Sequence, residues 1–146
     1  MLDSNKVKLA IAPIGWTNDD MPDLGAENTF EQCISEMALA GFKGSEIGNK
    51  YPQDPDVLKK YLDIRGLQIC NAWFSSYLTS KPYEETIEAF KAHCDKLYKL
   101  GAKVIGASEQ GNSIQGCLDK SILDEKPYYS DEQWDVVVKG FNEMGA

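Results

Sequence analysis

The chain alternates between amphipathic, helix-like stretches and short apolar runs. Three times such a stretch reaches a glycine and then turns apolar, in ALAGFKGSEIG, LDIRGLQICNAW and YKLGAKVIGASEQ, at Gly41, Gly66 and Gly101. A glycine just past a helix end provides the left-handed residue that stops the helix, and the apolar run after it is typical of a buried strand. A fourth stretch reaches Gly145 and is followed only by Ala146. With KVKLAIAP as a first strand, the pattern predicts four β-α units, cut where a fifth strand is due.

The predicted strands cover about residues 7–13, 42–47, 67–73 and 103–107. Helices are expected to begin at Thr29, Pro55, Pro82 and Ser130. Capping signals mark three of these starts. Thr29 and Ser130 stand three residues before a glutamine, and Asp54 precedes a proline at the first helical position. The last helix has the most regular apolar stripe, which predicts core positions at Trp134, Val137, Val138, Phe141 and Met144.

Alternating strands and helices predict an α/β fold with a parallel sheet, for which two architectures compete. A doubly wound sheet could be complete in 146 residues, whereas a (β/α)8 TIM barrel needs about 250. The chain contains neither GxGxxG nor GxxxxGK[ST], so nucleotide binding has no support. We therefore expect residues 1–146 to be the N-terminal half of a single barrel domain, holding about its first four β/α units.

Charge and cysteine usage exclude several classes of protein. The 15 basic and 23 acidic residues give a net charge of −8, which argues against binding to nucleic acid or to a membrane surface. No stretch approaches the roughly 20 apolar residues of a membrane span, and no signal peptide is visible. The four cysteines form no CxxC pair and only one histidine accompanies them, so a zinc site is disfavoured. We expect a cytoplasmic protein.

Polar side chains gather where the predicted strands end, which in parallel α/β folds is where ligands bind. They comprise amides, hydroxyls and carboxylates beside tryptophans, a combination suited to holding a polyol. The candidates are Trp16, Glu46, Lys50, Asn71, Trp73, Glu109, Gln110 and Gln115.

Each main candidate also has a structural interpretation. Glu46 could pair internally with Lys50, and Glu109 could simply be a solvated residue at the start of a loop. Trp16 and Trp73 could pack at the rim of the barrel. A Ser-His-Asp triad is disfavoured because His93 falls in the middle of a predicted helix. A glycosidase-like pair of Glu46 and Glu109 is conceivable but has no other support.

Several of these segments resemble a known family. The pieces PIGWTNDD at 13–20, EIGNKYP at 46–52 and EQGNSIQG at 109–116 are similar to the inosose dehydratases, which remove water from 2-keto-myo-inositol in inositol catabolism. That family resembles the xylose-isomerase-like barrels. The resemblance spans nearly the whole chain and implies a barrel about twice as long.

The resemblance also implies a divalent metal, manganese or cobalt, whose ligands are expected beyond residue 146, so no metal ligand is assigned in this chain. It further implies a polyol or ketone substrate, bound by Asn71 and Glu109 with tryptophan walls, and catalytic roles for Glu46 and Lys50. Alternatives are a sugar isomerase or epimerase of the same superfamily, and a non-catalytic half barrel that binds polyols. Open sheet edges lead us to expect a homo-oligomer or pairing with a second barrel half.

Overall fold

The structure is a computed structural model that describes residues 3 and 6–146. It divides into two compact units. The first extends to Trp73 and also includes Asp95–Gly106, and the second consists of Phe74–Cys94 and Ala107–Ala146.

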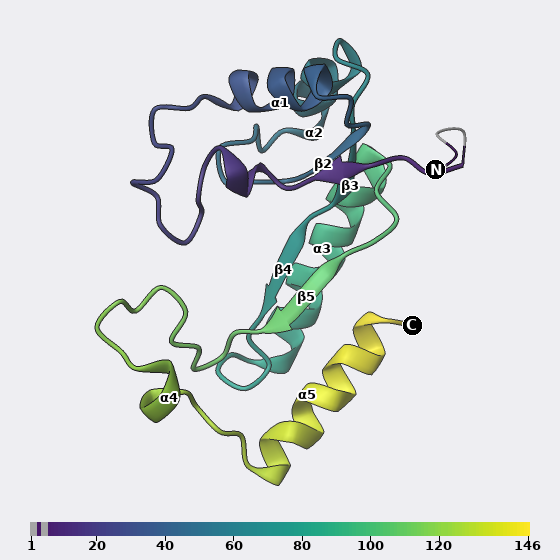
Figure 1. The fold of residues 1–146 in the computed structure, drawn as a ribbon. Coiled ribbons are helices and arrows are strands. Elements are labelled where there is room, and N and C mark those ends of the chain that lie inside the picture. The colour runs from purple at the N-terminus through teal and green to yellow at the C-terminus, as the bar shows by residue number, and fades with distance from the viewer. Residues whose placement is uncertain (1–2, 4–5) are drawn as a thin grey trace. The chain divides into compact units, whose positions relative to one another are not determined.

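The first unit is built on a parallel sheet of three strands in the order β1 (Ala10–Ile11), β2 (Gly44–Glu46), β3 (Gln68–Asn71) (Figure 1). Ser45 lies opposite Ile69, but the register then shifts, so that Glu46 lies opposite Asn71. This irregularity places one extra residue, Cys70, on β3 and kinks the end of the strand pair. As a result, Glu46 and Asn71 stand side by side at the carboxyl ends of adjacent strands.

Helices α1 (Phe30–Leu39) and α2 (Pro55–Asp63) lie together on one side of this sheet (Figure 1). Both begin where the sequence predicts. The Thr29 side chain accepts a hydrogen bond from the Gln32 N–H, and the Asp54 side chain accepts from Asp56 and Val57. Such caps satisfy backbone N–H groups that have no partner within the helix.

The core of the first unit is a continuous apolar cluster between these helices and the sheet. It is formed by Ile34 and Met37 of α1, Leu58 of α2 and Ile69 of β3, each at most 2% exposed. Leu97, near the end of α3 (Tyr83–Leu100), completes it. Burial of side chains from four elements fixes β2 and β3, and therefore the residues that follow them.

The second unit contains most of β4 (Trp73–Ser76) and β5 (Gly106–Glu109), which pair in a two-stranded sheet, followed by α4 (Ile122–Glu125) and α5 (Asp131–Met144). The ring of Phe74 packs edge-on against Phe90 with centroids 5.1 Å apart. Helix α5 begins with the predicted capping box of Ser130 and Gln133. Within this unit, α5 approaches Leu78 through Gly140, where an added Cβ would lie 2.5 Å from Leu78 Cδ1.

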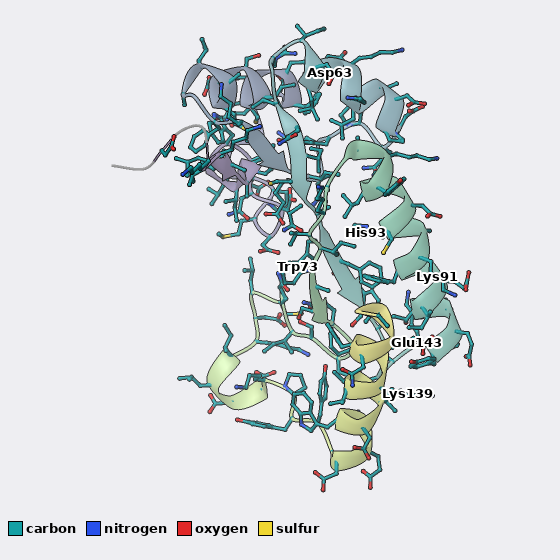
Figure 2. The ribbon with its side chains drawn as sticks, turned by 90° about the vertical axis from the view of Figure 1, so that its right-hand side faces the viewer. Asp63, Trp73, Lys91, His93, Lys139 and Glu143 are labelled. Carbon is teal, nitrogen blue, oxygen red and sulfur yellow. The ribbon has the colours of Figure 1, made fainter. Side chains whose placement is uncertain are left out.

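A surface cluster also joins α5 to the first turn of α3. The Tyr83 hydroxyl donates to Glu143, and the Lys139 ammonium lies 4.8 Å from the centre of the Tyr83 ring. Figure 2 labels Lys139 and Glu143 on α5. The hydrogen bond to Glu143 raises the pKa of Tyr83 to about 12, since it favours the protonated phenol.

Several sequence predictions were wrong in detail. The run at 67–73 is interrupted, because β3 ends at Asn71 and a separate strand, β4, begins at Trp73. The strand expected at 103–107 forms at 106–109 instead. Trp134 and Val138 are not core residues, since they are 53% and 55% exposed, and only Val137 of that stripe is buried. Gly41, Gly66 and Gly101 have the expected positive φ, whereas Gly145 has φ −87°.

Candidate functional site

The end of β2 and the end of β3 bring together Glu46 and Asn71. The Asn71 side-chain amide Nδ2 donates to Glu46 Oε1 over 3.1 Å. Both side chains are partly exposed. Among the residues that the structure describes, Glu46 Oε2 has no hydrogen-bond partner, so one carboxylate oxygen remains available to another molecule.

Trp73 borders the same pair, two residues further along the chain. Its side chain is 53% exposed (it is labelled in Figure 2). A Cβ built at Gly106 would lie 3.3 Å from Trp73 Cε3 and 3.3 Å from Asn71 Nδ2, so both side chains approach this glycine closely. The glycine leaves room for the amide and the aromatic ring, and the amide in turn contacts the carboxylate of Glu46. Such a group can hydrogen-bond the hydroxyls of a polyol and stack on its C–H face.

A buried pair of hydroxyls lies behind Glu46. The Ser45 hydroxyl donates to the Glu46 carbonyl over 2.8 Å, and it lies 2.6 Å from the Tyr51 hydroxyl. Burial, partly offset by the bond to Ser45, raises the pKa of Tyr51 to about 12. Tyr51 is therefore a neutral hydrogen-bond partner that fixes the backbone carrying Glu46, and the sequence analysis did not select it.

Trp16 is anchored at both its ring and its backbone. Its indole Nε1 donates to Glu36 Oε2 over 2.6 Å, and its carbonyl accepts from Asn28 Nδ2 over 2.7 Å. The bonds from Trp16 and Gln32 lower the pKa of Glu36. The ring is partly buried and packs against the apolar core of the first unit. This geometry favours packing over a free stacking surface.

Lys50 is engaged by the loop that follows Trp16. Its ammonium donates to the carbonyl oxygens of Gly25, Ala26 and Asn28 at 3.2, 2.9 and 2.7 Å. An ammonium has three protons, and three carbonyls accept them. Lys50 thus closes the loop, and the internal pair with Glu46 considered from the sequence does not form, since the described partner of Glu46 is Asn71.

Glu109, at the end of β5, accepts five hydrogen bonds of 2.6–3.2 Å. The donors are the hydroxyls of Ser76 and Thr79 and the backbone N–H groups of Leu78, Thr79 and Gly111. Burial alone would raise the pKa of this carboxyl, but the hydrogen bonds outweigh it and lower the pKa. The carboxylate joins the turn after β4 to the segment after β5.

Gly111 is required by this arrangement. A Cβ at this position would lie 2.2 Å from Thr79 Oγ1 and 2.5 Å from Glu109 Oε1. Its carbonyl accepts a hydrogen bond from the Tyr129 hydroxyl, which ties down the far end of the long connection at 108–129. Neither Gly111 nor Thr79 was selected from the sequence, because nothing local indicates that distant donors converge on Glu109.

The remaining candidates lie close to Glu109 along the chain. The Gln110 N–H donates to the Ser76 carbonyl over 2.8 Å, and its side-chain Nε2 lies 3.4 Å from Ser108 Oγ. Gln115 is exposed, and its N–H donates to Ser113 Oγ over 3.1 Å. The structure therefore gathers Glu46, Asn71 and Trp73 into one cluster, with Glu109, Gln110 and Gln115 in the second unit.

The described residues contain neither a cluster of three metal-ligand side chains nor a helix that could cross a membrane. Within residues 3 and 6–146, no three His, Cys, Asp or Glu side chains lie together in a way that could hold a metal ion. The described residues alone thus supply no group of three such ligands for the implied metal. No helix in that part of the chain is both long and apolar enough to cross a membrane.

Comparison with known proteins identifies close relatives. A scan against protein-family models finds no match. The chain is 66% identical over 145 residues to an inosose dehydratase of Geobacillus thermodenitrificans, and 64% identical over 145 residues to one of Clostridium beijerinckii. Each match covers 99% of this chain and 49% of the relative. The chain thus spans about half the length of the curated relatives that it matches.

Solved structures give the fold. A probable 3-DHS dehydratase of Bacillus anthracis superposes with a TM-score of 0.62 at 16% identity, covering 94% of this chain and 47% of that one. A xylose isomerase-like TIM barrel/4-hydroxyphenylpyruvate dioxygenase fusion protein gives 0.60 at 15% identity, covering 95% and 20%. The chain is therefore similar along its whole length to about half of an inosose dehydratase, and its fold matches part of a TIM barrel.

Proposed function

We propose that this chain is the polyol-binding part of a hydro-lyase that removes water from 2-keto-myo-inositol. The observation that carries this proposal is the cluster of Glu46, Asn71 and Trp73, which combines an available carboxylate oxygen, an amide and a half-exposed ring. Relatives at 64–66% identity named inosose dehydratase support the same reaction. The natural-length protein, rather than this chain alone, is the proposed catalyst.

The chemistry defines what the cluster must do. Dehydration breaks a C–H bond beside the ketone and the C–O bond of the adjacent carbon, forms a C=C bond and releases water. Glu46 accepts the proton from carbon through Oε2 and returns it to the departing hydroxide as the C–O bond breaks, so that water is released, while Asn71 holds Oε1. Trp73 stacks against the C–H face of the ring and excludes water from it.

Two other candidates receive different roles. We assign Lys50 to closing the loop at 25–28 instead of carrying a proton, because three carbonyls engage its ammonium. We assign Glu109 to organising its own unit instead of binding hydroxyls of the substrate, because the protein already supplies five donors to it.

The experiment is a dehydration assay on the natural-length protein with 2-keto-myo-inositol, followed by mass spectrometry. Loss of one water from the substrate is the expected result. An unchanged mass with a rearranged product would identify an isomerase or epimerase instead. Tight binding of the polyol without conversion would support the binding function and contradict the dehydration.

We further propose that a manganese or cobalt ion assists the reaction and is held by residues outside 1–146. The support is the similarity to the inosose dehydratases. Metal analysis should find about one bound ion per natural-length protein and none on the 146-residue chain. Stoichiometric binding by the shorter chain would overturn this assignment.

We also propose that this chain pairs with a second barrel half, in the cytoplasm. Strand β1 is an edge of its sheet, and Trp134 and Val138 of α5 are more than half exposed. Light scattering of the 146-residue chain alone should show self-association. When the second barrel half is added as a separate chain, a one-to-one complex of the two chains should form instead. A monodisperse monomer would contradict the pairing, and recovery of the protein in the membrane fraction would contradict the location.

A further inference from the structure

The side chain of Asn71 makes two polar contacts in opposite directions. Its Oδ1 accepts a hydrogen bond from the Gly106 N–H over 2.8 Å, and its Nδ2 donates to Glu46 Oε1 over 3.1 Å. A backbone N–H can only donate, so the amide oxygen must face Gly106 and the amide nitrogen must face Glu46. The orientation of the amide is therefore fixed by the start of β5.

The surroundings restrict this amide further. The register shift between β2 and β3 places Asn71 directly opposite Glu46. At Gly106, a Cβ would approach Asn71 Nδ2 and Trp73 Cε3 to 3.3 Å, which is tighter than ordinary contact, so the amide fits against the bare backbone. Three strand ends thus meet at one side chain: β2 through Glu46, β3 through Asn71 itself and β5 through Gly106.

We propose that Asn71 is a positioning residue that holds Glu46 Oε1 and thereby directs Oε2 toward the reacting carbon. This inference rests on the proposed function for the identity of the substrate. It replaces the role expected from the sequence, in which Asn71 binds a hydroxyl of the substrate directly. One N–H of its Nδ2 and one lone pair of its Oδ1 are already used by partners within the chain.

The primary test is Asn71→Asp in the natural-length protein. The variant has nearly the same shape and keeps an acceptor for the Gly106 N–H, but it replaces the donor to Glu46 with a second carboxylate oxygen. We expect kcat for 2-keto-myo-inositol to fall about 10- to 100-fold, the effect of losing one hydrogen bond to a charged group. The pH profile of kcat should also move to higher pH, because a like charge disfavours the ionised form of its neighbour.

A double-mutant cycle separates positioning from direct contact. If Asn71 acts through Glu46, adding Asn71→Asp to Glu46→Gln causes no further loss of turnover. If Asn71 contacts the substrate itself, the two losses multiply, and the proposal is overturned. Asn71→Ser provides a second variant should Asn71→Asp fold poorly, with a smaller loss expected and the same lack of additivity.

A measurement without substrate keeps this inference separate from the proposed function. Asn71→Asp should lower Tm by several degrees, and Glu46→Gln in the same chain should restore most of it, because the new amide donates to the new carboxylate. Independent effects on Tm would refute the Asn71–Glu46 coupling even if the enzyme dehydrates inosose. Restored Tm without any dehydration by the wild type would refute the proposed function alone.

Discussion

Glu46, at the end of β2, and Glu109, at the end of β5, look equivalent in the sequence, but the structure surrounds them differently. Glu46 accepts one hydrogen bond, from Asn71, and its second oxygen has no partner among the described residues. Glu109 accepts five, from two hydroxyls and three backbone N–H groups. Both side chains are partly exposed, so burial alone does not distinguish them.

The difference shows how to separate a binding carboxylate from a structural one. A carboxylate offers about four lone-pair positions, so the donors around Glu109 fill its capacity. A ligand hydroxyl would have to displace one of them. Glu46 can accept a new donor at no such cost. Position at the end of a strand therefore identifies candidates, and the number of donors supplied by the protein decides between them.

The largest expected effect is on turnover when Glu46 is neutralised. Glu46→Gln in the natural-length protein should lower kcat about 10²- to 10⁴-fold, the range for removing a general base, because the amide cannot accept the proton. Tm should change little, since the shape and the contact with Asn71 can be kept. Steady-state kinetics with 2-keto-myo-inositol provides the measurement, and undiminished turnover would remove Glu46 from the mechanism.

Neutralising Glu109 should have the opposite signature, a loss of stability. Glu109→Gln puts an NH₂ group among donors, so at least one backbone N–H loses its acceptor, and the free energy of unfolding should fall by about 2–3 kcal/mol. Urea unfolding measures this loss of unfolding free energy. Glu88→Gln is the matched control, because Glu88 is 72% exposed in a surface pair with Lys91 and should change stability by under about 0.5 kcal/mol. Equal effects for the two variants would contradict the structural role of Glu109.

A smaller effect is expected at Lys50. Lys50→Met removes three hydrogen bonds to the carbonyls of the loop at 25–28 and should cost about 1 kcal/mol, limited by solvent access to those carbonyls. Lys59→Met, which breaks an exposed pair with Asp63, is the control and should cost about 0.3–0.5 kcal/mol. Proteolysis should cut the loop faster only in the Lys50 variant. If both variants behave alike, Lys50 does not close the loop.

The smallest effect is the pH dependence of the Glu109 contribution. The pKa of Glu109 is lower in the folded chain than the ordinary glutamate value of about 4.3. Its ionised form therefore stabilises the fold at neutral pH, and this stabilisation is lost as the pH falls through the folded pKa. The difference in unfolding free energy between wild type and Glu109→Gln should be constant above about pH 5.5 and should shrink below about pH 4.5. A difference that grows on acidification would contradict the lowered pKa.

Much of the fold could be predicted from local signals in the sequence. The caps at Thr29, Asp54 and Ser130 are confirmed, because each depends on residues within three positions of the helix start. The similarity to inosose dehydratases is confirmed by relatives of 64–66% identity. The barrel architecture is confirmed by its structural neighbours. The placement of 1–146 in a single domain stays a prediction.

Features that depend on distant partners could not be predicted in this way. The register shift opposite Glu46 and the break between β3 and β4 arise from pairing between strands, which a local pattern does not encode. The donors around Glu109 come from a turn some 30 residues earlier. Trp134 lies on a regular apolar stripe and is nevertheless 53% exposed. Periodicity identifies an apolar face of a helix, but it does not show whether a neighbour covers that face.

The most direct measurement is a ¹³C NMR titration of the natural-length protein, labelled at the glutamate carboxyl carbons, with myo-inositol as a ligand that cannot be dehydrated through a ketone. The Glu46 resonance should move with saturation while the Glu109 resonance stays in place, because only Glu46 has an oxygen available to a ligand hydroxyl. A shift at Glu109 with none at Glu46 would show that the two carboxylates have the opposite roles.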